Sequence, residues 1–320
     1  MTAKMPVLVS AIKPSGTLHI GNYFGAMRQQ VELLRSGRYR AYIFVADYHA
    51  LTTTQDAEAM RRHTRELVMA YLAVGLDPKE VVLFKQSDVP AHTELAWIFD
   101  TITTVPYLMR AHAFKDAEAK GREVTVGTFN YPILMAADIL LYDAAVVPVG
   151  QDQKQHIEYA RDTAEKFNRT FKEEVFALPE AYIMPEVAVV PGTDGEKMSK
   201  SHGNVIPLFS SREDLAARVM SIVTDSSGTR PEHVYAIHKL VKSEEELAPL
   251  YEANAGKYKA LKDALIEDLD RFLTPMRERY AELEKDPSIA ESVLHQGRQE
   301  ARAVSEEKME MVRKTIGVSV

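Results

Sequence analysis

The sequence predicts an α/β fold, in which a doubly wound parallel sheet is followed by an α-helical C-terminal domain. From residue 5 to about residue 167, short apolar runs rich in Val and Ile alternate with stretches of helical periodicity. This alternation is typical of a parallel sheet covered by helices. Beyond about residue 207 the apolar runs fade and charged amphipathic helix takes over.

The individual elements follow from where apolar runs meet turn residues. Strands are predicted over residues 5–12, 39–46, 80–84 and 144–149. Three helices are predicted to follow strands: one that Asn22 caps and Gly37 ends, one over 56–74 that Gly75 ends, and one after the last strand and the turn 150–153, which runs to about residue 167. The later helices are predicted over 212–223, 244–251, 257–279 and 289–315, separated by loops that contain Pro231, Pro249 and Pro287.

Composition excludes several classes of protein. The chain has 320 residues, of which 46% are apolar and 27% charged, as expected for a folded protein of one or two domains. The absence of cysteine excludes disulfides, thiolate zinc sites and cysteine nucleophiles, and the formal charge of −7 argues against a general binder of DNA or other polyanions. No apolar run is long enough to span a membrane and no signal-type N-terminus is present, so we expect a cytoplasmic protein without a membrane partner.

Two short motifs point to ATP. The run His19-Ile20-Gly21-Asn22 forms a glycine loop that opens a helix, and a helix N-terminus is a natural anion site. The run Glu196-Lys197-Met198-Ser199-Lys200-Ser201 can place two positive charges and several backbone N–H groups on one polyphosphate. Alone, the second run could equally be a solvated basic turn. No metal-ligand spacing occurs, so no metal site built by the protein is predicted.

One carboxylate lies in an otherwise apolar stretch. Residues 131–141 are apolar enough to be buried, except for Asp138. Burying an unpaired carboxylate costs several kcal/mol, so Asp138 requires a donor from the protein or from a ligand. On a helix, Tyr131, Met135 and Asp138 share one face. Either a structural ion pair or a binding site would account for this acid.

A turn follows the last predicted strand. Gly150-Gln151-Asp152-Gln153 lies where a buried strand ends, so its side chains belong to the edge of the sheet where ligands collect. Asp152 could accept from a ribose hydroxyl or hold magnesium, or it could simply cap the next helix. His19 and His49 carry little weight individually, although the glycine loop around His19 would let its imidazole donate to phosphate oxygens.

With these residues in place, the chain resembles the bacterial-type tryptophanyl-tRNA synthetases of class I over nearly its whole length. The resemblance rests on four segments: 15–23, 131–142, 147–156 and 197–201. It implies a Rossmann-like catalytic domain over 1–206, a helical domain over 207–296 that recognises the tRNA anticodon, and a C-terminal helix over 297–320 that returns to the catalytic domain. The family usually has Gln at the position of Lys13, so this lysine adds a charge beside the ATP site.

The resemblance also implies roles for individual residues. His19, Lys197 and Lys200 would be catalytic. The implied ATP-binding residues are Lys13, Pro14, Ser15, Gly21, Asn22, Gly150, Gln151, Asp152, Val190, Lys197, Met198, Ser199, Lys200 and Ser201. The implied tryptophan-binding residues are Tyr131, Met135, Asp138, Gln153 and His49, with Asp138 accepting the indole N–H.

The implied reaction joins L-tryptophan to tRNA(Trp) through tryptophanyl-adenylate, with ATP and Mg²⁺, in a homodimer. A tyrosyl-tRNA synthetase is the nearest alternative. Met135 favours tryptophan, because the tyrosyl family typically has Gln at this position and a thioether suits an apolar indole. A synthetase-like RNA-binding paralogue without activity, or a small-molecule adenylyl transferase, would be a different class of answer. The intact motifs argue against the paralogue, and the long helical C-terminal region argues against the transferase.

Overall fold

The computed structural model describes residues 5–111, 114, 121, 123–149, 154–183, 189–224 and 230–319. Its centre is a parallel sheet with the strand order β3-β2-β1-β4-β5. The strands are β1 (Val7–Ile12), β2 (Arg40–Val45), β3 (Val81–Lys85), β4 (Val146–Val149) and β5 (Glu180–Ile183). The chain builds outward from β1 to β3, then crosses back to add β4 and β5 on the other side. The doubly wound parallel sheet is therefore confirmed, and β1 and β4 flank the point where the winding reverses.

Successive strand residues face opposite layers of helices. Leu8 and Ile43 belong to one buried apolar cluster, whereas their chain neighbours Val9 and Phe44 belong to another. The first cluster is covered by α2 (Arg28–Leu34) and α4 (Ala57–Ala73), and the second by α5 (Ala91–Ile102), α8 (Val126–Leu140) and α9 (Lys154–Phe171). Short elements complete this part: α3 (Asp47–Ala50), the 3₁₀ turn η2 (Gln86–Asp88) and α6 (Val105–Leu108).

The first helix differs from its prediction in two ways. It consists of α1 (Ile20–Asn22), a π-helical turn η1 (Tyr23–Met27) and α2 in direct succession. The expectation that Asn22 caps it was wrong, because His19 is the N-cap and Asn22 belongs to the first turn. Asn22 instead accepts the backbone N–H of His19 through Oδ1 at 3.1 Å. This bond fixes the backbone at the start of the glycine loop.

The C-terminal part is helical, as predicted. It contains α10 (Arg212–Met220), α11 (Glu232–His238), α12 (Glu244–Ala253), α13 (Tyr258–Lys285) and α14 (Ser288–Thr315). The prediction that Pro249 lies in a loop was wrong, since it lies inside α12. A proline removes one helical hydrogen bond, but Pro249 is exposed, so the carbonyl that loses its partner can face water.

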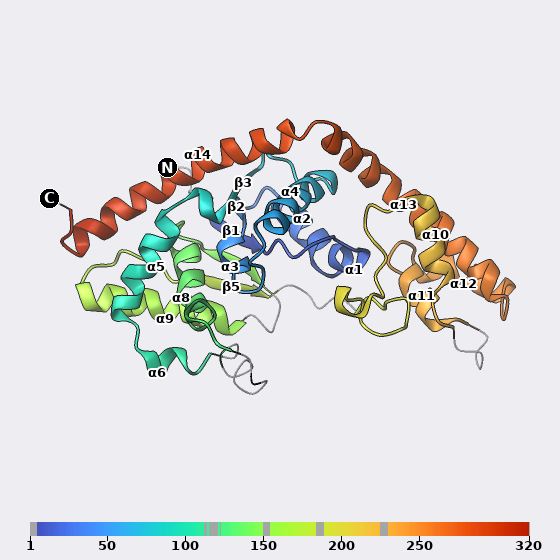
Figure 1. Ribbon diagram of the computed structural model, residues 1–320, viewed down its shortest axis with the longest axis horizontal. Helices are drawn as coiled ribbons and strands as arrows, with labels where there is room; N and C mark the ends of the chain where they lie inside the picture. Colours follow the sequence, from blue (N-terminus) through green and yellow to red (C-terminus); the bar gives the residue numbers. More distant parts are fainter. Residues whose placement is uncertain are drawn as a thin grey trace.

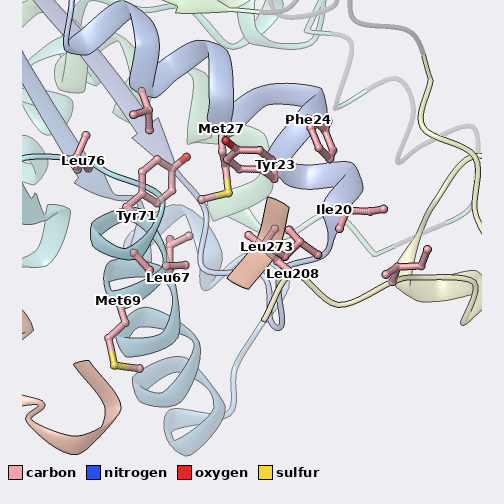
Figure 2. Packing of buried hydrophobic residues seen from close by; sticks show 14 of the residues in the cluster. Ile20, Tyr23, Phe24, Met27, Leu67, Met69, Tyr71, Leu76, Leu208 and Leu273 are labelled. Atoms are coloured by element: carbon pink, nitrogen blue, oxygen red, sulfur yellow. The ribbon is translucent and has the colours of Figure 1, made fainter. Parts of the chain in front are cut away.

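The helical part shares a core with the sheet. Leu208 and Leu273 pack beside Ile20 and Tyr23 in one apolar cluster (Figure 2). The C-terminal helix α14 then returns along the sheet-bearing part, whereas α13 leads away to the other helices (Figure 1). At the contact between α14 and β3, a Cβ on Gly297 would lie 1.9 Å from the carbonyl oxygen of Leu83. Only glycine permits this approach of helix to strand. Within the described residues, no helix combines the length and apolarity needed to cross a membrane.

Candidate active site

The two predicted ATP motifs line one cavity of about 460 Å³. Its described walls include Ser15, His19, Gly21, Asn22, Gly25, Val189, Val190, Lys197, Met198, Ser199 and Lys200. The fold brings the motifs together through backbone pairing. Ile20 donates its N–H to Ile206 at 3.0 Å, and Leu208 donates to Leu18 at 3.0 Å. Segments almost two hundred residues apart thus form one wall.

His19 is buried in the cavity wall, and one nitrogen of its ring is available to a ligand. Only 5% of its surface is exposed, and its Nδ1 has no hydrogen-bond partner among the described residues. Burial, assisted by the positive charge of Lys200, lowers the pKa of His19 to about 4. The imidazole is therefore neutral near pH 7. A Cβ on Gly21 would lie 2.9 Å from Nδ1, so glycine at position 21 leaves room for this ring.

Lys200 lies between the two motifs. Its ammonium donates to the carbonyl oxygen of Ser15 at 2.7 Å. Burial lowers the pKa of Lys200, while the charge of Glu66 acts in the opposite direction. Lys197 lies on the same cavity wall. A polyphosphate placed here would meet two lysines, a neutral imidazole and the N-terminal turn of α1.

A residue that the sequence did not single out holds the second motif in shape. Asn204 is 2% exposed, accepts the backbone N–H of Ser199 through Oδ1 at 2.8 Å, and donates from Nδ2 to Asp194 at 2.7 Å. The loop itself is a small hairpin, in which Met198 donates its N–H to Val190 at 3.0 Å. An asparagine one residue after Gly203 is typical of an ordinary turn, so its bracing role had no clear sequence signal.

A second cavity of about 380 Å³ opens beside the end of β1. Its described lining residues are Val9, Ser10, Ala11, Lys13, Gln30, Phe44, Ala46, His49, Tyr131, Met135, Asp138, Ile139, Val147, Pro148 and Val149. Four of the five residues expected to bind tryptophan are among them. A mostly apolar wall with a few polar groups is the usual form of a small-molecule site.

Asp138 is the polar centre of this cavity, and protein donors already surround it. It accepts from His49 Nε2 at 2.8 Å, from Gln86 Nε2 at 2.8 and 3.0 Å, and from His92 Nδ1 at 2.6 Å. Burial by itself would raise the pKa of Asp138, but the bonds from His49 and His92 outweigh it and lower the pKa to about 2. The carboxylate is therefore ionised and held in place at neutral pH. Gln86 and His92 were not predicted, because nothing in their local sequence indicates their partner.

The other predicted residues vary in their placement. Tyr131 is hydrogen-bonded through its hydroxyl to His156, and burial raises the pKa of Tyr131 to about 12, so the phenol stays protonated. Lys13 lies in the wall of the second cavity, where its ammonium donates to Thr52 Oγ1 at 3.3 Å and burial lowers its pKa. Pro14 and Ser201 are not among the residues that line either cavity. The roles expected for the turn after β4 stay predictions, because its residues Gly150, Gln151, Asp152 and Gln153 lie outside the described part of the chain.

The donor set at the first cavity does not resemble a metal site of its own. No carboxylate lines it within the described walls, and the described part of the chain contains no group of three His, Asp or Glu side chains that could hold an ion. Magnesium bound by substrate phosphates, with water completing its shell, would not need such a group.

Comparison with known proteins agrees with this arrangement. Residues 2–292 match the family described as tRNA synthetases class I (W and Y). The tryptophan–tRNA ligase of Fusobacterium nucleatum is 45% identical over 318 residues, covering 97% of each chain. The crystal structure of Campylobacter jejuni tryptophanyl-tRNA synthetase complexed with ADP and tryptophan superposes with a TM-score of 0.90 at 42% identity, covering 97% of this chain and 99% of that one. That of Mycoplasma pneumoniae superposes with a TM-score of 0.79 at 28% identity, covering 99% of both. The chain therefore belongs to the class I tRNA synthetases, in the family of the bacterial tryptophanyl-tRNA synthetases.

Proposed function

We propose that this protein ligates L-tryptophan to tRNA(Trp), using ATP and forming tryptophanyl-adenylate on the way. The observation that carries the proposal is the ionised Asp138 in the wall of an apolar cavity, together with a separate cavity lined by both ATP motifs. In the first step the tryptophan carboxylate attacks the α-phosphorus of ATP. A new C–O–P linkage forms and pyrophosphate leaves. In the second step a ribose hydroxyl of the tRNA displaces AMP.

The first cavity supports the adenylation step by charge stabilisation. Lys197, Lys200 and His19 line this cavity, which supports a role for the two lysines in binding the phosphates and the leaving pyrophosphate, and for His19 as a neutral hydrogen-bond donor. Magnesium enters with ATP as part of the substrate and neutralises phosphate charge there. The reaction requires no covalent bond between either lysine and the substrate. The enzyme therefore accelerates it by positioning the reactants and by stabilising charge.

The second cavity supports recognition of tryptophan over tyrosine. An indole carries one N–H on an otherwise apolar ring, and Asp138 offers an anionic acceptor among apolar walls. Met135 and Tyr131 lie on the same helix and line the cavity together with His49, and Gln153 is expected to complete the site. A site that pairs a substrate N–H rejects analogues that leave its acid unpaired.

The tRNA and the second subunit require surfaces outside these cavities. We assign the anticodon to the helical region 207–296, with 297–320 returning to the catalytic part. Two exposed apolar side chains support a homodimer: Trp97 on α5 is 71% exposed and Val126 at the start of α8 is 80% exposed. Asn130 and Asp100 hydrogen-bond at 2.8 Å and so hold these two helix ends together. We expect Trp97→Glu to convert a dimer into a monomer in light scattering coupled to gel filtration. A dimer that survives the change would place the interface elsewhere.

The enzyme is expected to act in the cytoplasm, where tRNA is used.

The test of the function is pyrophosphate exchange into ATP, run separately with each of the twenty amino acids. Tryptophan should support exchange. Tyrosine should fall short by a factor on the order of 10⁴, because a site built to hydrogen-bond one substrate group discriminates to about this extent against an analogue that lacks the group. Equal exchange with tyrosine would overturn the specificity. Exchange without transfer to tRNA would favour the inactive RNA-binding paralogue over a complete ligase.

A further inference from the structure

Behind Asp138 lies a layer of buried polar residues that do not line the cavity. His92 and Gln86 are both 0% exposed. His92 bonds to Asp138 through Nδ1 at 2.6 Å and to the hydroxyl of Tyr142 through Nε2 at 2.9 Å. A chain of hydrogen bonds therefore runs from Tyr142 through His92 to the carboxylate. Buried polar chains of this kind require complete pairing, because each unpaired group is costly.

The direction of this chain follows from chemistry. Burial, together with the negative charge of Asp138, raises the pKa of Tyr142 well above its usual value, so its hydroxyl keeps its proton. The hydroxyl can donate to Nε2, and the imidazole then carries its own proton on Nδ1 and donates it to Asp138. The carboxylate can only accept, so it requires the proton on Nδ1, and the Tyr142 hydroxyl stabilises this tautomer by donating to Nε2.

The two oxygens of Asp138 are not equivalent. Oδ1 accepts from His92, and Gln86 Nε2 lies closer to Oδ1 than to Oδ2, at 2.8 against 3.0 Å; neither donor lines the cavity. Oδ2 accepts from His49, which does line it. Oδ2 is therefore the oxygen on the cavity side. Three donors make four contacts with this carboxylate, two on each oxygen, and an indole N–H that reaches Oδ2 would replace the longer contact from Gln86 at 3.0 Å.

Aromatic packing restricts the side chains of Tyr142 and His92. Tyr142 stacks on Tyr42 with ring centres 4.9 Å apart and planes inclined by 23°. The ring of His92 lies 5.4 Å from Phe44 and 6.1 Å from Phe84. With its neighbours packed this tightly, the imidazole has little freedom to turn, and the carboxylate that it holds keeps one orientation.

We propose that His92 and Tyr142 are positioning residues for tryptophan recognition, which hold Oδ1 of Asp138 so that Oδ2 faces the indole N–H. The proposal rests on the proposed role of Asp138 as the indole acceptor. It assigns specificity to two side chains that touch neither the substrate nor the cavity.

The test measures discrimination for the indole N–H. Pyrophosphate exchange is run with tryptophan and with 3-(benzothiophen-3-yl)alanine, in which sulfur replaces the N–H. The ratio of the two kcat/KM values should be roughly 10- to 150-fold in the natural protein, the factor that a hydrogen bond to a charged group is worth. His92→Phe should lower that ratio at least about fivefold by raising the KM for tryptophan, and His92→Asn, whose Nδ2 lies near the place of Nδ1, should restore most of it.

Tyr142→Phe and Tyr42→Phe form the matched pair. Both remove one hydroxyl from the same ring stack, but the hydroxyl of Tyr42 interacts with Arg40 and not with His92. Tyr142→Phe should lower the ratio and Tyr42→Phe should leave it unchanged. If His92→Phe does not fold, the tyrosine pair still decides the matter. Tyr142→Phe and His92→Phe could instead lower the melting temperature while the ratio stays at the natural value. The hydrogen bonds from Tyr142 through His92 to Asp138 would then only stabilise the fold, and the inference would be wrong.

Asp138→Asn separates this inference from the function on which it rests. If Asp138→Asn also leaves the ratio unchanged, Asp138 does not accept the indole N–H and the proposed recognition fails. If Asp138→Asn lowers the ratio while the His92 and Tyr142 variants do not, the recognition stands and only the positioning role is overturned.

Discussion

Replacing Asp138 by Asn tests both the fold and the recognition of tryptophan, because this side chain is bonded to three protein donors and lines the cavity. Asparagine keeps the size of the side chain but removes its charge. It also offers one acceptor oxygen where the natural residue offers two. Its NH₂ group must then face either the His49 side or the side of Gln86 and His92, where donors already point.

The magnitude follows from the pKa. Lowering the pKa of Asp138 from its usual value near 3.8 to about 2 corresponds to roughly 2 to 3 kcal/mol of preference for the ionised form in the folded protein. We therefore expect the ligand-free variant to lose about 2 kcal/mol of stability and about 4 to 8 °C in melting temperature. Tryptophan-dependent exchange should weaken about tenfold or more through the loss of a charge-assisted bond, with the KM for ATP unchanged.

The pH dependence gives a second measurement. Because the folded pKa of Asp138 lies below the unfolded value, its contribution to stability is complete above about pH 4 and is lost as the pH falls toward 2. The difference in unfolding free energy between the natural protein and Asp138→Asn should therefore be constant from pH 8 to 5 and shrink below about pH 4. A constant difference down to pH 3, or a variant as stable as the natural protein at pH 7, would refute the assignment of these bonds to an ionised carboxylate.

Three further substitutions are predicted. Lys200→Ala should slow single-turnover adenylate formation by a factor of about 10² to 10³, which is the cost of losing one preorganised donor, while the affinity for tryptophan stays the same. An unchanged rate would mean that the motif is a solvated basic turn without a catalytic role. Asn204→Ala removes the acceptor of the Ser199 N–H and should cost about 1 to 3 kcal/mol of stability together with a slower adenylation rate, and a normal rate would show that the loop keeps its shape without this brace. Gly297→Ala would place a Cβ 1.9 Å from the carbonyl oxygen of Leu83, so chemical denaturation should report a loss of about 1 to 3 kcal/mol; unaltered stability would mean that α14 can shift away from β3.

The sequence predicted most of the sheet well because four of its five strands are largely buried. Continuous apolar runs bounded by turn residues indicated β1, β2, β3 and β4 nearly at their observed positions. The edge strand β5 was not predicted, because its residues are only partly buried and carry no continuous apolar signal. The short helix α11 and the helix α5 were also not predicted.

Only the site residues that belong to short sequence motifs could be predicted. The loop residues of both ATP motifs have local signatures, and the structure brings them to one cavity. Asn204 and His92 have none, because each acts through a partner that the fold supplies from another segment. Local patterns report the residues that touch a ligand more readily than the residues that hold them.

Asp138 combines two roles that its sequence presents as alternatives. A single buried acid needs only one explanation for its burial, either a structural ion pair or a ligand that it accepts from. A carboxylate has two oxygens, and here Oδ1 accepts from His92 and Gln86 behind the cavity, while Oδ2 accepts from His49 on the cavity side and from Gln86 at 3.0 Å. The donors come from α3, η2 and α5, which follow β2 and β3, while Asp138 comes from α8, which leads into β4. Because parallel strands end at one edge of the sheet, these segments converge on the same carboxylate, and the contacts that stabilise the acid are also the contacts that aim it.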